Sequence, residues 1–110
     1  MVTRSLCGFQ PLRRRNGVRL AGEIDCSNVW ELTGALDDLL RDRDAYVDMS
    51  TLQFVDVGGV RALVEEAGRR EPRRLVLVDP HPLVLQILDT CGWTTSPGLS
   101  VANADSWDAP

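Results

Sequence analysis

Three carboxylates, Asp25, Asp56 and Asp79, each stand where a predicted strand ends. The carboxyl ends of parallel strands meet at one edge of a sheet, so these side chains are candidates for holding Mg²⁺. Aspartate is also the common residue of turns and helix caps, and that role needs no partner from another strand. We therefore interpret the three aspartates as caps and turn formers, and we expect neither a metal site nor a cofactor.

No other grouping of residues favours catalysis. The only histidine, His81, lies between two prolines at a predicted helix start, where a capping role is more common than that of a general base. Three widely spaced cysteines form no C-x-x-C pair, which indicates reduced thiols rather than zinc ligands: Cys7, Cys26 and Cys91. The aspartates resemble those of phosphoryl-accepting receiver domains, but the adjacent acidic pair and the late lysine of those domains are missing. We expect no enzyme.

Two adjacent glycines, Gly58 and Gly59, open a predicted helix directly after a strand. Each costs ~1 kcal/mol of helix stability relative to alanine. A close backbone approach or a cluster of open amides would explain such a pair. Open N–H groups at a helix start favour an anion or a hydrogen-bonding loop of a partner. The segment lacks the length and the lysine of a P-loop.

Hydrophobic periodicity predicts strands that alternate with helices. The expected strands cover residues 6–12, 18–25, 45–49 and 75–78, and Asn16-Gly17 makes the turn between the first two. The expected helices cover about 29–40, 57–70 and 82–91, with a capping box of Asn28 and Glu31 or a cap at Ser27 before the first. Glu66 falls outside the predicted buried stripe of the second helix, whereas Val57 falls on it, and Cys91 lies on the apolar face of the third. Residues 75–78 read as a strand covered on both faces.

This order predicts a single α/β domain over residues 1–110. We expect a mixed, mostly parallel sheet of four to five strands with three to four helices, and a core over about 15–93. Leu99 and Val101 suggest a short edge contact, although residues 100–110 read as a flexible tail.

Length and charge limit the classes of partner. The chain has 110 residues and a net charge of −4, which argues against nucleic acid or an anionic membrane as the main partner. No apolar run approaches the ~20 residues of a membrane span or resembles a signal peptide, so we expect a cytoplasmic protein. Arg13-Arg14-Arg15 fits a solvated turn, or a grip on an acidic partner. Trp30 suits a contact surface or the core edge, and Trp107 a dimer anchor or a free tail; monomer and homodimer both stay open.

Four segments in this order resemble the STAS family of anti-sigma factor antagonists and transporter domains. They are Gly22-Glu23-Ile24-Asp25, residues 46–50, the junction Phe54-Val55-Asp56-Val57-Gly58-Gly59-Val60, and residues 75–78. The resemblance implies a non-catalytic α/β domain whose second helix docks on a protein partner. For stand-alone antagonists that partner is a kinase-like anti-sigma factor, which phosphorylates a serine or threonine at this junction.

The chain departs from the family at the phosphorylated position, which is Gly58 here, preceded by Val57. The resemblance therefore implies a docking surface without the usual phosphorylation switch. Ser27, Ser50 and Thr51 are weak alternative acceptors; their simpler roles are a helix cap and a turn. Two other roles stay open: an accessory subunit of a transporter ATPase, and a nucleotide-binding domain that uses the three aspartates. The expected partner-binding residues lie on two neighbouring loops: Asp25, Cys26, Ser27, Asp56, Val57, Gly58, Gly59 and Arg61.

Overall fold

The fold is built on a five-stranded sheet with its strands in the order β1-β2-β3-β4-β5. The computed structural model describes residues 7–103. Its elements, in chain order, are β1 (Cys7–Pro11), β2 (Gly17–Ile24), α1 (Val29–Leu39), β3 (Ala45–Val55), α2 (Val57–Arg69), β4 (Leu75–Val78), α3 (Pro82–Thr90) and β5 (Leu99–Ala102). The fold is the α/β class expected from the sequence, with a mixed, mostly parallel sheet and three helices.

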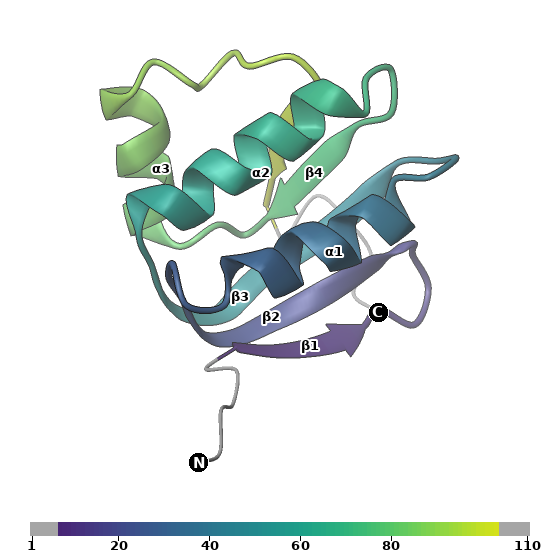
Figure 1. Ribbon diagram of the computed structural model, residues 1–110, viewed down its shortest axis with the longest axis horizontal. Coiled ribbons are helices and arrows are strands. Elements are labelled where there is room, and N and C mark those ends of the chain that lie inside the picture. The colour runs from purple at the N-terminus through teal and green to yellow at the C-terminus, as the bar shows by residue number, and fades with distance from the viewer. Residues whose placement is uncertain (1–6, 104–110) are drawn as a thin grey trace.

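The strand directions create two chemically distinct ends. Strand β1 pairs antiparallel with β2, whereas β2, β3, β4 and β5 all run parallel. In Figure 1 α1 and α2 lie side by side over one face of the sheet, and each connects two parallel neighbours. The β2–α1 and β3–α2 junctions therefore lie together at the left of that view, and the loops that lead into β3 and β4 lie at the right.

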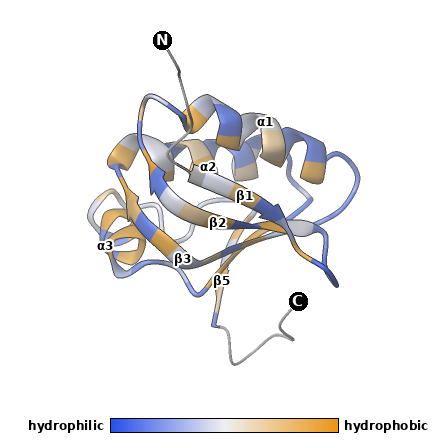
Figure 2. Cartoon of the chain, turned by 90° about the horizontal axis from the view of Figure 1, so that it is seen from below, coloured by the Kyte–Doolittle hydropathy of each residue, from blue (hydrophilic) through white to orange (hydrophobic). Residues whose placement is uncertain are grey.

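The core forms where the apolar stripes of the helices meet the sheet. Leu32 and Leu36 of α1 and Leu63 of α2 have no exposed surface, and they join one cluster with Leu20 and Leu77 of the strands. Each such leucine contributes about 1.5–3 kcal/mol by burial. Figure 2 shows polar segments interspersed with apolar ones along α1, as expected for a helix with one buried face.

Strand β3 is longer than predicted. It continues through Ser50 and Thr51 to Val55, so the prediction of a turn at these two polar residues is wrong. The Thr51 hydroxyl donates to the Leu20 carbonyl of β2 at 2.7 Å, and the register between the strands shifts between Arg19 and Ala21. Pairing with β2 thus keeps Ser50 and Thr51 in the strand despite the local shift in register.

The C-terminal prediction holds in part. Leu99 and Val101 lie in β5, which pairs with β4, so the edge contact is confirmed and Ser100–Ala102 are not a tail. Residues 104–110, including Trp107, lie outside the described residues. Strand β4 is also less covered than predicted, because Val76 is only half-buried.

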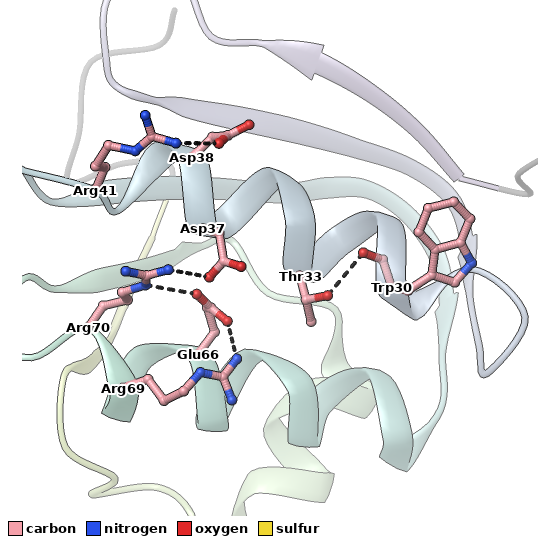
Figure 3. Close-up of polar contacts among 8 residues, drawn as sticks. All are labelled: Trp30, Thr33, Asp37, Asp38, Arg41, Glu66, Arg69 and Arg70. Carbon is pink, nitrogen blue, oxygen red and sulfur yellow. Dashed lines mark hydrogen bonds and ion pairs between the residues drawn. The ribbon is translucent and has the colours of Figure 1, made fainter.

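The expected helix faces of Glu66 and Cys91 are wrong. Glu66 has no exposed surface, although its charge placed it outside the buried stripe. It accepts from Arg69 and, at 3.2 Å, from Arg70, which also donates to Asp37 of α1 at 2.6 Å (Figure 3). Burial and the neighbouring Asp37 raise the pKa of Glu66 above its ordinary value. Cys91, expected on the apolar face of α3, is exposed.

Candidate functional site

The two loops predicted to bind a partner lie side by side at the carboxyl end of β2 and β3. Ile24 and Val55 are paired at the ends of these strands, and the Asp56 amide donates to the Ile24 carbonyl at 3.2 Å. We call the exposed parts of residues 25–27 and 56–61 the junction surface. The parallel register therefore brings together Asp25, Cys26 and Ser27 with Asp56, Val57, Gly58, Gly59 and Arg61.

The two glycines that open α2 have different roles. The Asp56 carboxylate caps the helix by accepting from the Gly59 amide at 2.9 Å, which confirms its interpretation as a cap. A Cβ atom at Gly59 would lie 2.6 Å from Val55 Cγ2 and 2.9 Å from Ile24 Cγ2, so this position must be glycine for close packing. At Gly58 a Cβ would meet only Asp56 Oδ1, at 3.4 Å. Gly58 is exposed and has room for a side chain.

Asp25 shapes the β2–α1 loop. Its carboxylate accepts from the Ser27 amide at 2.9 Å and from the Ser27 hydroxyl at 2.6 Å, which confirms it as a turn former. Both hydrogen bonds favour the ionised form and hold the pKa of Asp25 below its ordinary value. Cys26 and Ser27 are exposed beside it. The result is an ordered acidic turn on the junction surface.

The predicted capping box at the start of α1 does not form. Asn28 occupies the N-cap position, but its side chain makes no cap hydrogen bond. Its Oδ1 accepts from the Asp25 amide at 2.9 Å, and its Nδ2 donates to the Glu23 carbonyl at 2.8 Å. Asn28 is buried, and these two hydrogen bonds tie the loop back to the end of β2.

Large apolar side chains are exposed at this end of the molecule. Trp30 in the first turn of α1 is 67% exposed, Val57 is 46% exposed and Phe54 is 42% exposed. Figure 3 shows the Trp30 ring at the end of α1, away from the Asp37–Glu66 contacts. The exposure of Val57 corrects its expected place on a buried stripe. Phe54 was missed as a surface residue, because simple alternation along β3 would place it with the buried Leu52; the register between β2 and β3 shifts at this point.

The third aspartate does not join the other two. Asp79 is exposed after β4, in a left-handed conformation with a φ of 52°. Over residues 7–103, no three His, Cys, Asp or Glu side chains are grouped closely enough to hold a metal ion. His81 caps α3, because its Nδ1 accepts from the Leu83 amide at 3.0 Å, as predicted. Trp93 packs half-buried against the core.

The three hydroxyl side chains predicted as weak alternative phosphate acceptors differ in whether they are already hydrogen-bonded. The Ser27 hydroxyl donates to Asp25 and the Thr51 hydroxyl to Leu20, whereas Ser50 is exposed on β3. Of these, only Ser27 belongs to the junction surface. None of the helices described within residues 7–103 has the length and apolar character to cross a bilayer.

Comparison with known proteins identifies the family. A model for the family described as "Mlab, STAS domain" matches residues 7–100, which is most of the chain. The chain belongs to the STAS domain family. A search of curated proteins gives no match.

Two solved structures share the STAS fold. The anti-sigma factor antagonist SpoIIAA in its unphosphorylated form is similar with a TM-score of 0.64 and 19% identity, over 91% of this chain and 90% of that chain. A putative anti-sigma factor antagonist from Thermotoga maritima gives a TM-score of 0.67 and 14% identity, over 91% and 88% of the two chains. At these identities the likeness concerns the fold, and the arrangement of sheet and helices is the part in common.

Proposed function

We propose that this STAS protein is a non-catalytic binding module that docks its junction surface on a kinase-like anti-sigma factor. The observation that carries the proposal is the exposed start of α2, with Val57 and Gly58 open to solvent beside the ordered Asp25–Ser27 turn. The similarity of the fold to SpoIIAA supports a protein partner of this kind. The large exposed side chains at the same end supply the apolar contacts that such interfaces need.

The same surface lacks the hydroxyl that a phosphorylation switch requires. At the position where the family resemblance implies the acceptor, Gly58 has no side chain, and Val57 before it is aliphatic. We therefore propose that the protein binds its partner constitutively, in the cytoplasm. Because Gly58 has room for a side chain, its glycine is not explained by packing alone.

A pull-down with a tagged Gly58→Asp variant tests this function. The substitution places a carboxylate where the family's phosphate would lie, beside Asp56, and the open space accommodates it. Gly58→Asn is the matched control, because it has the same size without the charge. We expect wild type and Gly58→Asn to capture an ATPase-type anti-sigma factor, identified by mass spectrometry, and Gly58→Asp to lose it.

The second candidate function is an accessory subunit of a transporter ATPase. A docking surface without an acceptor hydroxyl also suits a permanent structural partner, which is the observation that favours this role. Capture of an ATP-binding cassette protein, equally by wild type and both variants, would select it. Phosphate found on Ser27, Ser50 or Thr51 after treatment with a cognate kinase would contradict the absence of a switch.

A further inference from the structure

A broad, shallow depression lies at the opposite end of the parallel strands from the junction surface. Its volume is about 680 Å³, and it is widely open to solvent. Three loops build it, at the right of Figure 1: the β1–β2 turn, the segment before β3 and the segment before β4. We call it the arginine pocket, and its lining includes Arg14, Arg15, Asp42, Arg43, Asp44 and Arg73.

The arginine pocket is positively charged in a protein whose net charge is negative. Four arginines face two aspartates, which leaves two positive charges in excess. Within the described residues, Arg14, Arg43 and Arg73 have no carboxylate within ion-pair distance. By contrast, Arg19, Arg41, Arg69 and Arg70 each form an ion pair elsewhere on the molecule. The pocket thus gathers three arginines, Arg14, Arg43 and Arg73, that form no ion pair within residues 7–103.

The loops of the pocket are held in place by hydrogen bonds to backbone groups. Asn16 Nδ2 donates to the Leu39 carbonyl at 2.7 Å and to the Asp44 carbonyl at 2.9 Å, and the Asn16 carbonyl accepts from the Tyr46 amide at 2.9 Å. The Arg15 guanidinium lies 4.8 Å from the centre of the Tyr46 ring, which orients it by a cation–π contact. The cationic groups are therefore carried by ordered segments, as a binding site requires.

Arg73 of the pocket has a buried polar atom without a hydrogen-bond partner among the described residues. The Nε atom of Arg73 is shielded from solvent and has no hydrogen-bond partner among residues 7–103. A buried donor without a partner is destabilising, and more so when it is charged. The Asp44 carboxylate is already engaged, because it accepts from the Arg74 amide at 2.9 Å. The half-buried Arg73 side chain is therefore not fully satisfied by the described part of the protein.

From these observations we infer that the arginine pocket binds a phosphate-bearing small molecule. The excess of two positive charges matches a phosphate dianion, and the forked guanidinium groups bind its oxygens in pairs. Tyr46 and Pro72 in the lining offer an apolar wall to an organic group. A single phosphate group matches this small charge excess better than the many carboxylates of an extended acidic peptide. This site lies away from the junction surface and does not depend on the proposed docking.

Titration calorimetry of the full chain with pyrophosphate tests the inference. We expect saturable binding with a Kd of about 1 mM or tighter. Arg43→Gln and Arg73→Gln should each weaken it about tenfold, because each removes a charge-assisted contact. Arg41→Gln is the matched control: it makes the same change of charge near the pocket, on a side chain that is paired with Asp38 and does not line it. It should change the Kd less than twofold.

Thermal unfolding, vesicle flotation and titration with an oligoglutamate peptide complete the test. Thermal unfolding of each variant checks the fold, and the exposed Arg43 keeps the test valid if Arg73→Gln unfolds. Flotation with vesicles that contain phosphatidic acid distinguishes the source of the phosphate. If the wild-type protein floats with the vesicles and Arg43→Gln does not, the ligand is a lipid headgroup. If the wild-type protein binds pyrophosphate but does not float with the vesicles, the ligand is a soluble phosphate ester. The inference is overturned by absent pyrophosphate binding, by equal weakening in Arg41→Gln, or by binding of an oligoglutamate peptide alone.

Discussion

The two ends of the parallel strands are closed in different ways. At the amino end, a Cβ at Gly17 would lie 2.0 Å from the Tyr46 carbonyl oxygen, so backbone packs directly on backbone. At the carboxyl end, Gly59 packs instead on the side chains of Val55 and Ile24. The amino end therefore rests on the less deformable contact, and it carries Arg14, Arg43 and Arg73, which form no ion pair within residues 7–103. The carboxyl end exposes apolar side chains and helix amides, which suit a protein partner.

Gly17→Ala should have the largest effect on stability and would show that the amino end does not yield. The added methyl group meets a backbone carbonyl, which no rotamer change can relieve. We expect a loss of at least about 3 kcal/mol in the free energy of unfolding, measured by urea denaturation. Gly34→Ala in α1 is the control, because its Cβ meets nothing within 4 Å. That variant should gain up to ~1 kcal/mol. Equal stability of the Gly17→Ala and Gly34→Ala variants would show that the backbone contact at Gly17 does not constrain the amino end.

Gly59→Ala should have an intermediate effect and would measure how far the carboxyl end can yield. Its methyl group meets two side-chain atoms, so we expect a loss of about 1–3 kcal/mol by the same assay. Gly58→Ala, one residue earlier, should stay within about 0.5 kcal/mol of wild type, since its side chain points into open space. A larger cost at Gly58 than at Gly59 would contradict the assignment of roles.

The smallest effect concerns pH and the Glu66 contacts, which lie on the side of the amino end. Burial raises the pKa of Glu66 above its ordinary 4.5, and the neighbouring Asp37 raises it further. Arg69 and Arg70 lower the pKa but do not cancel this increase. As the pH falls towards 4.5, the folded state binds this proton before the unfolded state does, so stability rises. Asp37 and Asp48 have lowered pKa values and act in the opposite sense, below about 3.8.

We expect Glu66→Gln to abolish the rise in stability between neutral pH and pH 4.5. The change should be below about 1 kcal/mol, because the two arginines offset part of the burial cost. Urea denaturation over this pH range measures it, and Glu65→Gln, on an exposed neighbour, is the control. A pH profile that is the same for Glu66→Gln and wild type would show that Glu66 is not the group responsible.

Much of the fold followed from periodicity, and the misses share one cause. The helices around Leu32, Leu63 and Val84 were predicted because the spacing of apolar residues is itself a local property. Ser50 and Thr51 were misread because their strand conformation depends on pairing with β2. Glu66 was misread because its burial accompanies the packing of α2 on α1, where its partner Arg70 also donates to Asp37 of α1.

The candidate site divides in the same manner. The caps by Asp56 and His81 were predictable, because each joins a side chain to an amide two or three residues away. Asn28 shows the limit of such reasoning. Its spacing to Glu31 suggested a capping box, but its buried side chain bonds to Glu23 and Asp25 instead. The exposure of Phe54 and Val57 also needed the packed structure.

The sequence by itself determined the order of elements, the caps of α2 and α3 and the glycine at position 58, since these depend on residues close together in the chain. Only the tertiary structure decided which glycine is required for packing and which is open. It alone also brought Arg14, Arg43 and Arg73 into one pocket. The physical reason is the parallel register, which aligns the starts of strands that lie far apart in the chain and so gathers the loops that precede them.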